Sequence, residues 1–375
     1  MAPKKCKSDA RTRAAYGSTG FLAPAGWAWD HCRRESNLIR GAPVSANLAH
    51  FQIGTRLPSA YPNNDQSAWI ISHRPPKAAV NAFEPNGFFL ERERSRSGRI
   101  VSSGTIFLTN KECPWRCLMC DLWKHTLSHS VPNGAIPRQI DYALKQMGEL
   151  PEQIKLYNSG SFFDPAAIPP GEYSAIADRV SFTKHVVVES HPRLIAKSAT
   201  RLRDLLEGSL EVAMGLETVH PEVLPRLNKR FTLDHFAQAA TLLRKEGIDV
   251  RAFVLVQPPF LDEAEAVEWA VKSARFAFSC GANVVSLIPT RPGNGALDRL
   301  MSAGEFAPPS LRVLEESFDQ SLILGSGRVF ADTWDLERFS NCKSCFKARK
   351  ERLDLMNLCQ QLLPRISCAC AHEGF

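Results

Sequence analysis

Eight of the eleven cysteines lie in two short groups, and clustered thiols are typical ligands for zinc or iron. The first group has the spacing C-x3-C-x2-C and consists of Cys113, Cys117 and Cys120. Three thiolates so close together can converge on one metal centre. They suit an iron–sulfur cube with one iron left open, or a zinc ion with Asp121 or His125 as its fourth ligand.

The second group lies near the C-terminal end and contains two close pairs, Cys342-x2-Cys345 and Cys368-x-Cys370. Two pairs separated by a helical stretch are typical of a tetrahedral zinc site with four thiolate ligands. A second iron–sulfur cluster and free reduced thiols are the alternatives, and Cys359 is a spare ligand.

From residue 100 onward, short runs rich in Val, Ile, Leu and Phe alternate with helical patterns. Such alternation predicts parallel βαβ units, and six strands predict an α/β fold, a partial (β/α)6 TIM-like barrel, with a doubly wound sheet as the alternative. The first cysteine group directly follows the first strand. The expected strands are 100–109, 154–160, 185–190, 210–218, 250–259 and 282–290.

Two glutamates end the third and fourth expected strands, Glu189 and Glu217. The carboxyl ends of parallel barrel strands meet at one mouth, where barrel enzymes carry out their chemistry. A carboxylate there can accept hydrogen bonds from a ligand, so Glu189 and Glu217 are the candidate catalytic residues. A structural ion pair, for instance with Arg193 or Arg226, explains these residues equally well.

The chain resembles the radical SAM superfamily over residues 80–300, through the C-x3-C-x2-C motif after a first strand. The resemblance implies that Cys113, Cys117 and Cys120 hold a [4Fe–4S] cluster whose open iron chelates S-adenosylmethionine. It also implies an external one-electron reductant and a 5′-deoxyadenosyl radical. The further cofactor-binding residues that it implies are Met119, Asn158, Ser159, Gly160, Glu189, Glu217 and Ile288.

A narrower resemblance is carried by the phrases CPWRCLMCDLWKHT, KLYNSGSFFDPAAIP and VAMGLETVHPEVLPRLNKRFT. They are similar to archaeosine-synthase-type radical SAM proteins, which are related to elongator-type enzymes. This implies a tRNA substrate and cleavage of a carbon–nitrogen bond in a lysine-modified deazaguanine base. A peptide or small-metabolite substrate is one alternative, and a non-catalytic, zinc-stabilised RNA-binding protein is another.

The basic residues are concentrated in the N-terminal quarter, which suits contact with RNA phosphates. Residues 1–100 hold 15 Lys and Arg against 7 Asp and Glu, although the whole chain has a net charge of only +7. We expect a loop-rich basic extension over 1–80, the barrel over 81–325 and a Cys-rich, metal-binding appendage over 326–375. No apolar run is long enough to span a membrane, and no secretory leader is evident, so we expect a cytoplasmic protein. The sequence does not indicate the oligomeric state.

Overall fold

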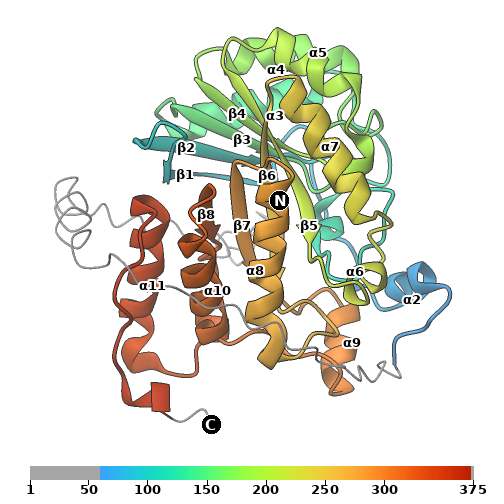
Figure 1. Ribbon diagram of the computed structural model, residues 1–375. Helices are drawn as coiled ribbons and strands as arrows, with labels where there is room; N and C mark the ends of the chain where they lie inside the picture. Colours follow the sequence, from blue (N-terminus) through green and yellow to red (C-terminus); the bar gives the residue numbers. More distant parts are fainter. Residues whose placement is uncertain (1–59, 373–375) are drawn as a thin grey trace, which may run out of the picture.

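The structure, a computed structural model, describes residues 60–372 (Figure 1). Most of the expected N-terminal extension, residues 1–59, therefore lies outside the described residues. Within the described part, no helix combines the length and the apolar character needed to cross a bilayer.

One curled sheet of eight strands forms the centre of the fold, and its strands follow one another in chain order. β1 is antiparallel to β2, and every later strand is parallel to the one before it. The expected partial barrel is therefore confirmed. The strands are β1 (Gly87–Arg94), β2 (Ile100–Phe107), β3 (Gln153–Tyr157), β4 (His185–Glu189), β5 (Ser209–Glu217), β6 (Asp249–Val256), β7 (Val284–Pro289) and β8 (Arg328–Ala331).

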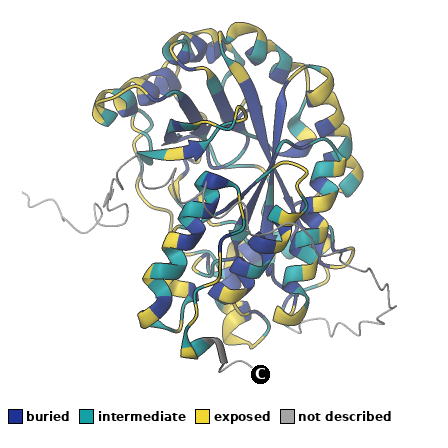
Figure 2. Cartoon of the chain, turned by 60° about the vertical axis from the view of Figure 1, so that its left-hand side comes forward, coloured by how far each residue is buried: buried dark blue, intermediate teal, exposed yellow. Residues whose placement is uncertain are grey.

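Helices connect the parallel strands and cover the outer face of the sheet (Figure 1). The strands are mostly buried, whereas the helices expose one side to solvent (Figure 2). The helices are α2 (Gln66–Ser72), α3 (Ala135–Met147), α4 (Tyr173–Val180), α5 (Lys197–Leu205), α6 (Val223–Arg226), α7 (Leu233–Lys245), α8 (Glu263–Ser279), α9 (Ala296–Ser302), α10 (Leu311–Ile323) and α11 (Lys343–Cys359), with 3-10 turns η2 (Leu122–His125), η3 (Pro170–Glu172), η4 (Pro192–Leu194), η5 (Leu336–Phe339) and η6 (Ala369–His372).

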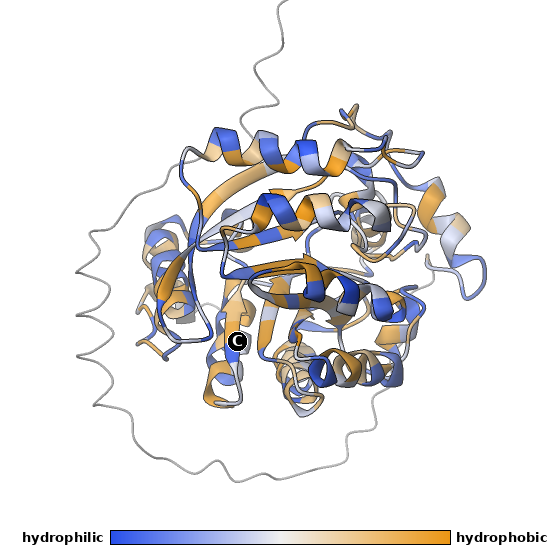
Figure 3. Ribbon diagram, turned by 90° about the horizontal axis from the view of Figure 1, so that it is seen from above, coloured by the Kyte–Doolittle hydropathy of each residue, from blue (hydrophilic) through white to orange (hydrophobic). Residues whose placement is uncertain are grey.

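The hydrophobic core lies between this outer sheet face and the helices, and it follows from the two-residue repeat of a strand. In β3, Ile154 and Leu156 belong to the core, while Lys155 between them points to the inside of the barrel. In β4, Val186 and Val188 belong to the same core. Seen from above, apolar residues dominate the strands, and the helices carry both apolar and polar positions (Figure 3).

The inside of the barrel holds a buried network of charged side chains. Arg251 of β6 donates hydrogen bonds to Glu93 of β1 at 2.7 Å and to Glu211 of β5 at 2.6 Å. Lys155 pairs with Glu93 and with Glu91, the latter at 2.6 Å. Burial alone would raise the pKa of Glu93, but the charges of Arg251 and Lys155 hold it below its ordinary value. The network thus ties β1 to strands on the far side of the sheet.

The C-terminal segment supplies the last strand of the sheet and a helix that packs on its edge. β8 pairs with β7, and α11 contacts both β1 and β8. The Asn357 amide donates to the backbone oxygen of Ala331 and accepts from its N–H, both at 2.8 Å. Arg352 donates to Asp319 of α10 at 2.7 Å. These contacts place α11 across the gap between the two edge strands.

Replacing the central cation of the interior network is expected to destabilise the fold strongly. Arg251→Met leaves Glu93 and Glu211 buried without their main partner, which costs about 3–5 kcal/mol of unfolding free energy at neutral pH. Both carboxyl groups have lowered pKa values in the folded protein. Their stabilisation is therefore present above the ordinary carboxyl pKa and lost as the pH falls below it. Urea unfolding measured at several pH values checks both expectations.

The matched control is Arg312→Met, because Arg312 pairs with Glu263 at the surface and is 54% exposed. That change is expected to cost less than about 1 kcal/mol. Equal losses in the two variants, or a difference that persists in acid, would contradict the assigned role of Arg251.

Candidate functional site

The first cysteine group lies on the loop that follows β2, at the mouth of the barrel. Asn294 donates its side-chain amide to the backbone oxygens of Leu118, at 2.7 Å, and Cys120, at 3.2 Å. Asn228 donates in the same way to the oxygen of Arg116 at 2.6 Å. Amide side chains from elsewhere in the chain therefore fix the backbone of this loop between its cysteines.

An aromatic pair fixes the same loop against the next strands. The rings of Trp115 and His191 are stacked, with centroids 3.8 Å apart and planes 6° from parallel. Burial lowers the pKa of His191 to about 3, so the ring is neutral at physiological pH. Its Nε2 donates to the Lys229 oxygen at 2.9 Å, and its Nδ1 accepts from the Arg193 N–H at 3.2 Å. His191 thus orients Trp115 without carrying a charge.

The three thiols of the loop are held in an environment that disfavours free thiolates. Burial raises the pKa of Cys113 to about 11 and of Cys120 to about 12, and raises that of Cys117 well above its ordinary value. None of the three forms a disulfide. Because a metal binds the thiolate, coordination would stabilise the form of these side chains that burial disfavours.

Lys229 is the cation that faces these thiols, and it lies in a loop between α6 and α7. Its ammonium group opposes the burial effect on the pKa of Cys113 and Cys117. It donates to the backbone oxygen of Gly215 at 2.8 Å and to the carboxylate of Glu217. A Cβ on Gly215 would collide with both charged groups, so any larger residue there would displace the ion pair. The sequence analysis missed Lys229, since a single lysine in a loop carries no pattern.

Glu217 ends β5 in a strained position, because the register shifts between Gly215 and Glu217, and Glu217 has φ of 64°. Its side chain is nearly buried, and Lys229 is its ion-pair partner. A structural ion pair, the alternative that the sequence left open, is therefore present at Glu217, with Lys229 as the partner in place of Arg193 or Arg226. Arg226 lies instead 3.5 Å from the ring centroid of Phe260.

Glu189 ends β4 and lies beside the 158–160 segment that follows β3. Its carboxylate accepts a 2.6 Å hydrogen bond from the backbone N–H of Asn158, and the N–H groups of Ser159 and Gly160 also favour its ionised form. Burial nevertheless raises the pKa of Glu189 to about 7. Glu189 therefore holds the backbone of this segment. It forms no ion pair with Arg193, whose guanidinium donates to the Arg230 oxygen.

These groups surround one cavity of about 520 Å³ at the mouth and inside of the barrel, a size typical of small-molecule sites. Ser159, Gly160, Met119 and Ile288, which the family resemblance implies as cofactor-binding residues, line this cavity. Asn158 does not line it, and its side chain is buried without a hydrogen-bond partner. The cavity is also lined by the aromatic residues Phe89, Phe107, Trp115, Trp123, Tyr157, Phe253, Phe330 and Trp334.

Comparison with known proteins agrees with this geometry. Residues 108–270, which include the cysteine loop and strands β3 to β6, match the family model of the radical SAM superfamily. Residues 108–270 are a radical SAM domain. The resemblance that the sequence indicated is therefore confirmed. Radical SAM proteins bind a [4Fe–4S] cluster and S-adenosylmethionine, which together supply a 5′-deoxyadenosyl radical.

Two archaeal relatives extend the similarity beyond that core. The uncharacterized protein MJ0550 of Methanocaldococcus jannaschii is 24% identical over 310 residues, 76% of this chain and 85% of that protein. Archaeosine synthase subunit beta of Methanosarcina acetivorans is 27% identical over 287 residues, 71% of this chain and 82% of that protein. The expected relationship to archaeosine-synthase-type radical SAM proteins is thus confirmed as sequence similarity.

Among solved structures, Elp3 of Methanocaldococcus infernus with an N-terminal deletion is similar to this radical SAM protein, with a TM-score of 0.40 and 16% sequence identity. The match covers 52% of this chain and about half, 51%, of that structure.

Removing the ammonium group of Lys229 is expected to destabilise the fold, because the carboxylate of Glu217 is then buried without its ion-pair partner. Lys229→Met should lower the unfolding free energy by about 3–5 kcal/mol, and adding Glu217→Gln should restore at least half of that loss. Urea unfolding of the metal-free protein under reducing conditions measures both. The control, Lys272→Met, removes a surface partner of Glu268 and should cost less than about 1 kcal/mol. A double variant no more stable than Lys229→Met alone would refute the pairing.

Proposed function

We propose that this protein is a radical SAM enzyme that modifies a base in tRNA, with its catalytic cluster held by Cys113, Cys117 and Cys120. The observation that carries the proposal is the group of three partly buried thiols at the mouth of the barrel, within the region that matches the family model. The match to that family favours a cluster, in which each thiolate binds a different iron, over a single zinc ion.

The residues around the thiols fit such a cluster and its nucleoside cofactor. Lys229 offsets the negative charge that three thiolates would bring into a buried place. Gly160 leaves room beside the cluster ligand, because a Cβ there would lie 3.3 Å from the Cβ of Cys113. Met119 and Ile288 supply apolar surface for the adenine. The cofactor is expected to occupy this part of the cavity.

The two glutamates act on the cofactor site through other groups. Glu189 fixes the backbone of Ser159 and Gly160, which line the cavity, and Glu217 fixes Lys229. We therefore assign both as positioning residues, instead of the direct catalytic and cofactor-binding roles that the sequence suggested. The electron for the reaction has to come from an external reductant.

A modified base in tRNA is the substrate that the relatives support best. Two curated relatives are named archaeosine synthase subunit beta. The aromatic residues of the cavity suit a planar base, and the basic N-terminal quarter suits a phosphate backbone. The specific reaction we propose is cleavage of a carbon–nitrogen bond in a lysine attached to a deazaguanine base, which leaves an amidine.

Loss of one thiol of the first group is expected to abolish the cluster, because two thiolates rarely hold an iron–sulfur cube. Anaerobic reconstitution of the unmodified chain with iron and sulfide should give a brown protein that cleaves S-adenosylmethionine when reduced. Cys117→Ala should remain colourless and inactive, while Cys280→Ala, which changes a thiol at the end of α8, should behave like the parent. A colourless parent that binds zinc at these thiols would instead support a non-catalytic RNA-binding protein.

The substrate class is tested by binding and by product analysis. Bulk tRNA should be retained at low salt and released as salt rises, since phosphate contacts release counterions. Nucleoside mass spectrometry of tRNA from cells with and without the gene should show one modified base lost and its lysine-bearing precursor accumulated. Cleavage of S-adenosylmethionine without tRNA retention or a nucleoside change would indicate a peptide or small metabolite as substrate.

A further inference from the structure

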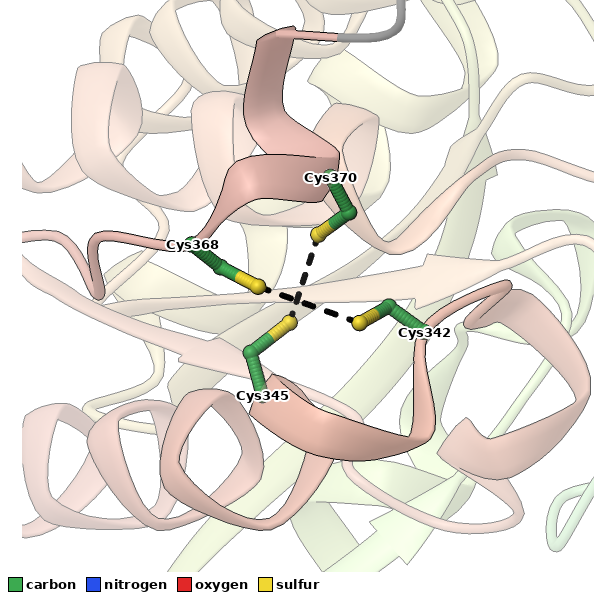
Figure 4. A group of neighbouring side chains, drawn as sticks. All are labelled: Cys342, Cys345, Cys368 and Cys370. Atoms are coloured by element: carbon green, nitrogen blue, oxygen red, sulfur yellow. Dashed lines mark hydrogen bonds between the residues drawn. The ribbon is translucent and has the colours of Figure 1, made fainter.

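The two close pairs of the second group, Cys342 with Cys345 and Cys368 with Cys370, come together at the start of α11. Cys342 is the N-cap residue of this helix, and Cys345 lies in its first turn. Cys368 and Cys370 come from the final described turn and approach from the opposite side (Figure 4). The four side chains point toward a common centre between the helix and the chain end (Figure 4). Two segments that are separate in sequence thus meet at these four thiols.

The distances between the sulfurs decide what kind of centre they fit. The Sγ atoms of Cys342 and Cys368 are 3.8 Å apart, those of Cys345 and Cys370 are 3.5 Å apart, and all four lie within 4.8 Å of one another. A tetrahedral zinc ion with Zn–S bonds of about 2.3 Å places its sulfurs about 3.8 Å apart. In a [4Fe–4S] cluster each thiolate binds a different iron, and in a [2Fe–2S] cluster the two pairs of thiolates bind different irons, so the core holds some of the sulfurs further apart than one zinc ion does.

We propose that Cys342, Cys345, Cys368 and Cys370 bind a single zinc ion, and that this ion fixes one wall of the central cavity. The first half follows from the four sulfurs, which are close enough for one ion and too close for a cluster. All four ligands come from the protein, so the ion has no open position and is structural, not catalytic. Arg349, one turn along α11, lies within hydrogen-bond reach of Cys345 and helps to balance the excess negative charge of four thiolates.

The second half of the proposal follows from the path of the chain between β8 and α11. Asp332, Thr333 and Trp334 leave β8 and line the cavity. Trp334 packs 4.7 Å from the ring of Phe89, measured between centroids. The segment then turns through η5 and reaches Cys342. One end of this cavity wall is held by the sheet, and its other end is held by the metal ligands.

Arg291, at the end of β7, supports the middle of the same segment. It forms an ion pair with Asp332 at 2.8 Å and donates to the Trp334 oxygen at 2.6 Å. Without the ion, Cys342 and Cys345 would lose their link to Cys368 and Cys370. The wall would then be held by β8, by Arg291 and by the packing of Trp334 on Phe89, with no fixed point at its Cys342 end. The proposal concerns the folded chain and does not rest on the radical chemistry.

Metal analysis in a Cys117→Ala background tests the first half, because that variant lacks the catalytic cluster and leaves the second group as the remaining thiol site. Full-length protein in this background should contain one zinc and no iron. Adding Cys368→Ser and Cys370→Ser should remove the zinc, while adding Cys280→Ser should retain it. In the parent chain with intact cysteines, cobalt in place of zinc should show the absorption of a tetrahedral tetrathiolate site.

Four outcomes would overturn the single-ion assignment: iron with inorganic sulfide at the second group, no bound metal, two disulfides among these cysteines, or a cobalt spectrum without thiolate bands. None of them bears on whether the first group holds a catalytic cluster, so the two proposals fail independently.

Hydrogen exchange tests the positioning role in the parent chain. Removing zinc with a chelator should accelerate exchange of the amides in residues 333–345 at least tenfold, and it should leave the amides of β4 and β5 unchanged. Adding zinc back should restore the slow exchange. Unchanged exchange in residues 333–345 after confirmed zinc loss would overturn the link between the ion and the cavity wall.

Discussion

The guanidinium of Arg251, held between Glu93 and Glu211, is the interaction on which the shape of the barrel depends. The sheet is open, so the backbone hydrogen bonds of its ladder do not join β1 to β6 or β8. Arg251 and Lys155 supply that connection from inside, because each pairs with a carboxylate of β1. A buried charge without its partner is costly, so the strands have to stay curled around the network. The same curvature creates the cavity.

The site at the mouth is formed at the carboxyl ends of the strands, which the curvature of the sheet brings close together. The cysteine loop, the 158–160 segment, Glu189 and Glu217 leave four successive strands and face one space. Both carboxylates of the site have partners within the protein. Glu217 forms an ion pair with Lys229, and Glu189 accepts a hydrogen bond from a backbone N–H group. Such pre-arranged partners keep a buried polar site in one geometry before any ligand arrives.

The sequence predicted those parts of the molecule that depend on neighbouring residues. The spacing of Cys113, Cys117 and Cys120 is local, and the six expected strands correspond to β2 through β7 because buried parallel strands are continuous apolar runs. It missed β1 as a full strand because its Glu91 and Glu93 read as surface charge, although they point inward. The sequence also did not predict β8, because this strand is short and is recognised only by its pairing with β7. Lys229 and the stacking of His191 on Trp115 depend wholly on tertiary placement.

The chain-order arrangement of the strands has a consequence for biosynthesis. Each strand pairs with the one made just before it, so a nascent chain can extend the sheet as it leaves the ribosome without inserting a strand between two others. Glu93, however, gains its ion-pair partner only when Arg251, which lies 158 residues later, has been synthesised. The α11 segment and its thiols are completed only by the last residues. The charged interior of the barrel is thus completed late in synthesis, and a chain cut short before β6 would carry the cysteine loop without all the strands that surround the cavity.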